Sequence, residues 1–295
     1  MSNKMRTLSD EQIFFFLENG YVRIPHCFDR KLAEEWGAFT FERLGYDPDD
    51  PATWAEHRVH MPRMNTVDVA EFAPKAWAGM CDLMGGADRI KTPVTWADGF
   101  ICNFNLRADE PWEPPSADSL GWHKDGDWFK HFLDSPEQGL LTIVIWSDIL
   151  PQSGGTFVAP DSVGHIARYL ADYPAGLLNK DAQFGKLIHK CEQFEEITGE
   201  IGDVILIHPY MLHAASSNPS GRARFITNPA VSLNDPMCFD RAYGDYTLVE
   251  QVVLNALGVD SLDWQITSER ELVVPERIAR QQKMLEDQKA RLGVA

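Results

Sequence analysis

The feature that most constrains the fold is a run of short β-like segments between about residues 92 and 235. Nearly every gap between these segments contains Gly, Pro, Asn or Asp. Many short strands separated by turn residues predict a sandwich, a barrel or a jelly roll. The segments are 99-GFICNFNLR-107, 121-GWHKD-125, 140-LLTIVIWSDI-149, 155-GTFVAP-160, 185-GKLIHKCEQF-194, 202-GDVILIHP-209 and 223-ARFITNPAVSL-233.

Helices are expected on both sides of this β region. Ser9 and Gln12 form a capping-box pattern, which predicts a helix from about Asp10 to Asn19 that ends at Gly20. The remaining pattern predicts a strand at 21–28, helices at 29–46, 68–83 and 165–178, a long loop at 47–66, and a charged, solvent-exposed helix at 275–292. We therefore expect one domain over residues 1–295, mainly β with flanking helices: N-terminal helices in 9–85, a core in about 92–235 and a C-terminal helical extension in about 245–295.

Composition limits the partners. The formal net charge is −17, which disfavours nucleic acid and anionic membranes because both bind basic surfaces. The longest apolar run, 140-LLTIVIW-146, is too short to span a bilayer, and the first residues lack a signal-peptide core. Five widely spaced cysteines without a Cys-x-x-Cys motif are typical of a reducing compartment. These features predict a cytoplasmic protein that acts on a small molecule.

Two segments carry candidate metal ligands. If 121–125 is a strand end, His123 and Asp125 project from the same face, and Trp122 and Lys124 point away from it. A third ligand is expected from 202-GDVILIHPYMLHAAS-216, which carries His208 and His213. Two histidines and one carboxylate leave open positions on an octahedral metal and suit non-haem Fe(II), whereas a hydrolytic zinc site is more often tetrahedral.

These segments resemble the phytanoyl-CoA dioxygenase-like group of Fe(II)/2-oxoglutarate oxygenases. The resemblance runs from Gly20-Tyr21 and the strand VRIP through His123-Lys124-Asp125 and 146-WSDILPQSGGTFVAPDSVGH-165 to 202-GDVILIHPYMLHAASSNPSGRAR-224. It implies a double-stranded β-helix (a cupin-like jelly roll). It also implies that His123, Asp125 and His213 are the catalytic metal ligands, because the family pattern places the ligand at the second histidine of the last segment. His208 then matches a second-shell position.

The resemblance also implies a site for 2-oxoglutarate. Arg224 matches an arginine that follows the distal histidine by about eleven residues, and a guanidinium binds a carboxylate bidentately. Trp146 matches an inward aromatic residue that borders the co-substrate, and Thr142 shares its strand face. Ile226 stands where many relatives carry a hydroxyl group. Asn103 is a further candidate for co-substrate binding, with a role at the sheet rim as the alternative.

The implied activity is an Fe(II)/2-oxoglutarate-dependent dioxygenase that uses O2 to oxidise an unactivated C–H bond. Relatives that halogenate replace the acidic ligand, so Asp125 implies hydroxylation, desaturation or ring closure, in natural-product or other secondary metabolism. Two alternatives stay open: a cupin-like metal-dependent hydrolase or isomerase, and a non-catalytic jelly roll that binds a small molecule. A homo-oligomer through the C-terminal helix is a further possibility. Candidate substrate contacts are Asn105, Trp128, Phe129, His131, Arg63 and His60.

Overall fold

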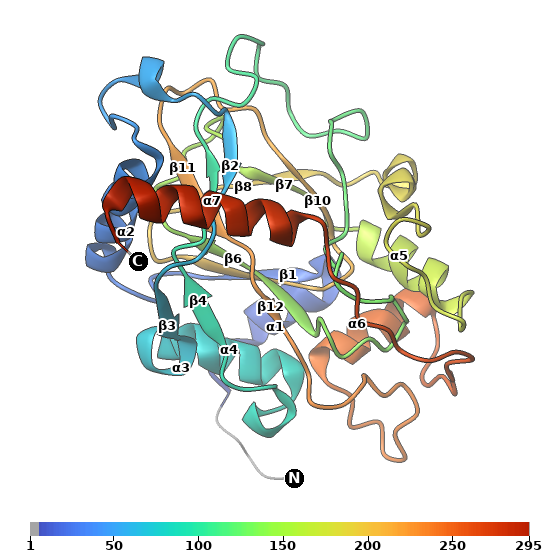
Figure 1. Cartoon of the computed structure of the whole chain (residues 1–295). Coiled ribbons are helices and arrows are strands. Elements are labelled where there is room, and N and C mark those ends of the chain that lie inside the picture. The colour runs from blue at the N-terminus through green and yellow to red at the C-terminus, as the bar shows by residue number, and fades with distance from the viewer. Residues whose placement is uncertain (1–5, 295) are drawn as a thin grey trace.

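The computed structural model describes residues 6–294 and contains two antiparallel sheets that form a jelly roll (Figure 1). The smaller sheet has the order β10 (Leu212–Ala215), β7 (Thr156–Ala159) and β8 (Glu195–Ile197), and a separate ribbon pairs β3 (Thr66–Asp68) with β4 (Thr95–Ala97). The main sheet has the order β1 (Tyr21–Ile24), β9 (Val204–Ile207), β6 (Leu140–Ile145), β11 (Arg224–Thr227), β5 (Ile101–Asn103) and β2 (Arg58–His60), and β12 (Ala230–Val231) also pairs with β6.

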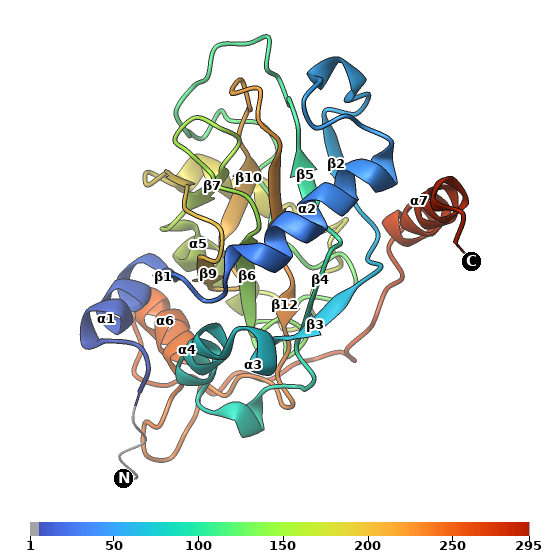
Figure 2. The ribbon, with the colours of Figure 1, turned by 90° about the vertical axis from the view of Figure 1, so that its left-hand side faces the viewer.

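Helices cover the outer face of the main sheet. Figure 2 shows α2 (Arg30–Leu44), α3 (Val69–Phe72) and α4 (Pro74–Met84) on one side of it. Every residue of β6 and β9 is buried, because one face of these strands meets the helices and the other faces the interior of the jelly roll. The other helical elements are α1 (Asp10–Asn19), α5 (Ser162–Ala171), α6 (Leu248–Leu257), α7 (Arg277–Leu292), and the 3-10 helices η1 (Pro51–Thr53), η2 (Ala87–Arg89) and η3 (Phe184–Lys190).

The expected elements mostly form, with differences that have physical causes. The capping box of α1 is confirmed: Ser9 accepts a hydrogen bond from the backbone of Gln12, and Gly20 ends the helix with a φ of 69°. Residues 185–194 were expected to form a strand, and most of them lie instead in η3. The expected loop at 47–66 contains β2, whose single buried residue, Val59, gives little hydrophobic signal. No helix within residues 6–294 has the length and apolar character needed to cross a membrane.

A buried arginine connects three distant segments. The guanidinium of Arg43, on α2, is completely buried and forms an ion pair with Asp98, whose Oδ2 lies 3.1 Å from Nη1. Its Nε donates to Oε1 of Gln288 on α7 at 3.0 Å, and its Nη2 donates to the carbonyl of Pro62. The prediction of a merely solvent-exposed C-terminal helix is therefore wrong in part, because Gln288 is only 2% exposed.

Replacing Asp98 with alanine is expected to lower the free energy of unfolding by about 3–5 kcal/mol, because the charge of Arg43 would remain buried without its partner. Asp98 also accepts hydrogen bonds from the backbone of Met64 and Asn65. Urea unfolding measures the change. Glu34→Ala is the control: it breaks the exposed pair of Glu34 with Arg30 and should cost less than about 1 kcal/mol. Equal losses in the two variants would contradict the assignment of Arg43–Asp98 as a structural pair.

Candidate active site

His123, Asp125 and His213 come together between the two sheets. His123 and His213 form an isolated antiparallel bridge, in which each backbone N–H donates to the carbonyl of the other residue at 3.0 Å. Nε2 of His123 lies 3.4 Å from Oδ1 of Asp125, and Nε2 of His213 lies 3.6 Å from Oδ2. The ligand atoms of all three residues lie within 4.8 Å of one another, so they can hold one metal ion. Residues 121–125 make this bridge without forming a regular strand.

The local chemistry of the triad fits a cation. Nδ1 of His123 lies 2.7 Å from the carbonyl of Gly121, and Nδ1 of His213 lies 3.2 Å from that of Met211. A proton on each Nδ1 satisfies these carbonyls and leaves a lone pair on each Nε2. Nε2 of His213 is buried and has no hydrogen-bond partner within residues 6–294. Burial opposes ionisation of Asp125, but the nearby histidines outweigh it and hold the pKa of the carboxyl well below its usual value.

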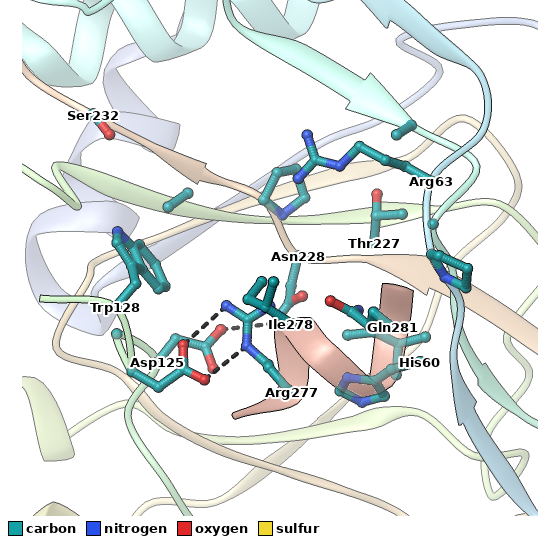
Figure 3. A pocket seen from close by; sticks show the side chains of 18 of the residues that line it. His60, Arg63, Asp125, Trp128, Thr227, Asn228, Ser232, Arg277, Ile278 and Gln281 are labelled. Atoms are coloured by element: carbon teal, nitrogen blue, oxygen red, sulfur yellow. Dashed lines mark hydrogen bonds and ion pairs between the residues drawn. The ribbon is translucent and has the colours of Figure 1, made fainter. Parts of the chain in front are cut away.

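Two features position Asp125. Nδ2 of Asn228 donates to Oδ2 of Asp125 at 2.7 Å (Figure 3). Gly126 turns the chain directly after the carboxylate with a φ of 126°, and a Cβ at this position would lie 2.4 Å from Cε1 of His131. Asn228 was not predicted from the sequence, although it lies four residues after Arg224 and directly after the end of β11.

Asn228→Ala is expected to weaken Fe(II) binding or to lower activity by about 10- to 100-fold, because a ligating carboxylate without its hydrogen-bond partner loses its fixed orientation. Anaerobic Fe(II) titration and succinate formation measure the two effects. Asn179→Ala is the matched control, since Asn179 lines the same cavity and makes no contact with the triad that the structure records. Unchanged Fe(II) affinity and activity in Asn228→Ala would remove Asn228 from the site.

Arg224 lies deep inside the jelly roll. It is 2% exposed, and its Nε donates to the carbonyl of Gly154 at 2.6 Å and its Nη1 to that of Ile101 at 3.1 Å. Nη2 makes no hydrogen bond within residues 6–294. Burial lowers the pKa of Arg224 to about 9, and nearby Arg58 contributes to the shift. A carboxylate bound beside this guanidinium would offset the cost of burying its charge.

A second arginine shares the row of Arg224 and was not found from the sequence. Asn103 of β5 pairs with Arg224 of β11 on one side and with Arg58 of β2 on the other, so the three side chains lie on the same face. The sequence predicts a loop at 47–66, and with only Val59 buried, β2 gives no alternating pattern that would place Arg58 on the inner face. Two guanidinium groups in one row make this end of the interior favourable for an acid group.

Three residues expected to contact the co-substrate are engaged in other contacts. Ile145 pairs with Ile226, which shares the inner face with Arg224, so the next residue, Trp146, points to the helices. Its ring lies 5.0 Å from that of Trp36 on α2. Thr142 is on the same outer face and donates to the carbonyl of Pro229. Asn103 faces inward, but its side chain bonds to the backbone of Ser216 and Leu106.

A cavity of about 1370 Å³ opens beside the triad. His60, Arg63 and Trp128, three of the six predicted substrate contacts, line it together with His123 and Asp125. Figure 3 shows Trp128 on one side and Arg63 and His60 on the other. The other three predicted contacts do not line it: Phe129 and His131 are 1% exposed and pack in the core, and Asn105 bonds to His57.

Lys124 is not the outward spacer that strand alternation predicted. It is 4% exposed, and its Nζ lies 3.1 Å from Nδ1 of His131 and 3.2 Å from Oε1 of Gln138. Burial lowers the pKa of Lys124 to about 7. The side of the bridge opposite the metal ligands is covered by η3 and residues 126–132, so neither Lys124 nor Trp122 reaches solvent.

The second histidine of the last segment, and not the first, completes the triad. His208 is fully buried, its Nε2 lies 3.3 Å from the carbonyl of Val249, and its Nδ1 accepts from the backbone of Tyr210. Burial lowers the pKa of His208 to about 3, so it is neutral. His208 therefore has a structural role, because it links the backbone of Val249 and Tyr210 in the core behind the site.

Fold and site together define a jelly-roll protein with a centre of two histidines and one carboxylate. The sequence profile of the family described as phytanoyl-CoA dioxygenase (PhyH) matches residues 16–226, which include the triad and Arg224. The chain belongs to this family, whose members use Fe(II), 2-oxoglutarate and O2. The resemblance and the fold class expected from the sequence are confirmed.

Solved structures give distant matches. The α-ketoglutarate-dependent epimerase SnoN from nogalamycin biosynthesis is 17% identical, with 76% of this chain and 82% of that chain covered and a TM-score of 0.46. The carbocyclase SnoK from the same biosynthesis is 18% identical, with 90% and 97% covered and a TM-score of 0.44. EctD from S. alaskensis is 16% identical, with 79% and 78% covered and a TM-score of 0.41. No curated protein matches the sequence.

Proposed function

We propose that this protein is an Fe(II)/2-oxoglutarate-dependent oxygenase that oxidises an unactivated C–H bond of a small molecule, in natural-product or other secondary metabolism. The convergence of His123, Asp125 and His213 beside a cavity carries the proposal. The set leaves open coordination positions, as non-haem iron oxygenases require. When bound, the iron would couple the oxidative decarboxylation of 2-oxoglutarate by O2 to oxidation of the substrate.

The residues of the chain have separate tasks in this proposal. His123, Asp125 and His213 hold the metal, and Asn228 fixes the orientation of the carboxylate. Arg224 binds the far carboxylate of 2-oxoglutarate through the guanidinium nitrogen that the protein leaves open, and Arg58 adds positive charge in the same row. The cavity of about 1370 Å³ is larger than the roughly 300–1000 Å³ typical of ligand pockets, so it has room for a substrate beside the co-substrate.

An anaerobic titration tests the proposal. Fe(II) and 2-oxoglutarate together should give a weak visible charge-transfer band, and neither should give it alone. A cupin-like hydrolase or isomerase would give no band, and the same absence in repeated titrations would overturn the oxygenase assignment. A non-catalytic jelly roll would release no succinate with any compound.

The substrate and outcome require a screen. Candidate small molecules are incubated with Fe(II), 2-oxoglutarate and O2, and mass spectrometry follows succinate and the products. A gain of about 16 mass units indicates hydroxylation, and a loss of about 2 indicates desaturation or ring closure. An epimerised product has the same mass as the substrate, so the same screen includes a chiral or chromatographic separation.

A further inference from the structure

The cavity differs in charge from the rest of the protein. The chain has 44 acidic and 27 basic side chains, yet five basic and only two acidic side chains line the cavity. Both acids are engaged, because Asp125 belongs to the triad and Asp127 forms a bidentate ion pair with Arg277 at 2.7 and 2.9 Å. Of the basic side chains, Arg277 is engaged by Asp127, and Nζ of Lys124 is bonded to His131 and Gln138. Arg63, Lys91 and Lys180 therefore remain to attract a ligand.

Arg63 is the basic residue best placed to use this charge. Figure 3 shows its side chain extending toward the cavity on the side opposite Trp128, with no hydrogen bond or ion pair to the other residues drawn. The two residues after Arg63 are anchored to buried Asp98, which accepts hydrogen bonds from the backbone N–H groups of Met64 and Asn65 at 2.7 and 3.0 Å. The backbone next to Arg63 is thus held in place, while its guanidinium group remains available to bind a ligand. Lys91 and Lys180 also line the cavity.

Helix α7 supplies a different kind of wall. Ile278, Gln281, Gln282 and Leu285 line the cavity, and their spacing places them on one face of the helix. Figures 1 and 2 agree that α7 lies outside the main sheet as a separate layer. The helix is held at both ends, by Arg277 with Asp127 and by Gln288 with Arg43.

This wall lies beyond residue 226, where the match to the family profile ends. The residues that match the family profile include the metal-binding triad and Arg224, whereas α7 lies outside the matched region. Its aliphatic and amide side chains, with Trp128 across the cavity, suit a partly apolar body with a few polar groups.

We propose that the substrate is a small molecule with an apolar body and one acidic group, that Arg63 binds the acidic group, and that α7 selects the body. This proposal rests on the proposed function, because only an enzyme has a substrate. The preference of the cavity for an acidic ligand can nevertheless be measured without turnover.

Two fluorescent probes with the same rings test it. 8-Anilinonaphthalene-1-sulfonate carries an acidic group, and N-phenyl-1-naphthylamine is the same molecule without it. Each is titrated anaerobically into protein that contains Fe(II) and saturating 2-oxoglutarate, so that Arg224 is occupied. The wild type should bind the sulfonate more tightly. Arg63→Gln should weaken sulfonate binding by about 5-fold, as expected for a partly exposed charge pair, and leave the neutral probe unchanged.

Two further variants make the result specific. Leu285→Trp, which adds bulk on the cavity face of α7, should weaken both probes by similar factors. Arg280→Gln changes an exposed arginine of α7 that does not line the cavity, and it should change neither. Equal binding of the two probes by the wild type, or no effect of Arg63→Gln, would overturn the proposal.

A third measurement separates substrate from co-substrate. If Arg63→Gln raised the 2-oxoglutarate concentration needed for the charge-transfer band and left sulfonate binding unchanged, Arg63 would belong to the co-substrate site and the proposal would be wrong. If the wild type gave no band, the proposed oxygenase function would fail. The comparison of the two probes without iron would then still report whether the cavity prefers anions.

Discussion

Replacing His213 with alanine is expected to abolish succinate formation and to weaken Fe(II) binding by more than about 100-fold. Loss of a residue that only supports a ligand typically costs about 10- to 100-fold, and His213 is assigned as a ligand itself. Its side chain is 7% exposed, and its buried Nε2 faces the carboxylate of Asp125. A water molecule in place of the imidazole would bind the metal more weakly, because the protein would not hold it in a fixed orientation. Anaerobic Fe(II) titration with and without 2-oxoglutarate measures the effect.

His189→Ala is the control for this variant. His189 is exposed near the end of η3 and lies outside the cavity, so its loss should change neither Fe(II) binding nor turnover. Circular dichroism shows whether each variant is folded. A folded His213→Ala protein that binds Fe(II) as the wild type does would exclude His213 as a ligand and return the choice to the other histidines of the chain.

Replacing Arg224 with methionine is expected to raise the 2-oxoglutarate concentration for half-maximal turnover by about 10- to 100-fold. A hydrogen bond to a charged group contributes about 1.5–3 kcal/mol, which corresponds to that range. Fe(II) binding without the co-substrate should change little, because Arg224 does not contact the triad in any interaction that the structure records. Titration of the charge-transfer band with 2-oxoglutarate separates the two steps.

Two further variants distinguish a loss of co-substrate binding from a purely structural effect of the substitution. Arg224→Lys keeps the charge but loses the planar fork that also bonds Gly154 and Ile101, so it should recover only part of the affinity. Arg222→Met removes an exposed arginine two residues earlier and should have no effect. If Arg224→Met lowered the thermal midpoint but left the affinity for 2-oxoglutarate unchanged, Arg224 would be a structural residue.

The metal-binding residues could be predicted from the sequence because they combine residue type with a short spacing. His123 and Asp125 are two positions apart, and the segment with His213 is apolar enough to be recognised as part of the core. Resemblance to a family was needed to choose His213 over His208, because both lie in the same segment, residues 202–216. Arg224 was found by its distance in sequence from His213.

The surroundings of the site depend on packing that no local pattern encodes. Trp146 was expected to face the co-substrate, but the register of β6 with β11 turns it toward α2. Lys124 was expected in solvent, but η3 covers it. The cavity wall on α7 has few apolar residues and is held by polar contacts to Arg43 and Asp127, so its sequence looked like an exposed helix.

The bond between Arg43 and Gln288 has a consequence for how the protein is made. The two residues are 245 positions apart, whereas the triad and Arg224 are complete once residue 224 has been synthesised. A contact over such a separation closes a very long loop, which is entropically costly and slows folding. During synthesis, the metal-binding core is therefore expected to take shape first, and the wall on α7 to dock onto it as a late folding step.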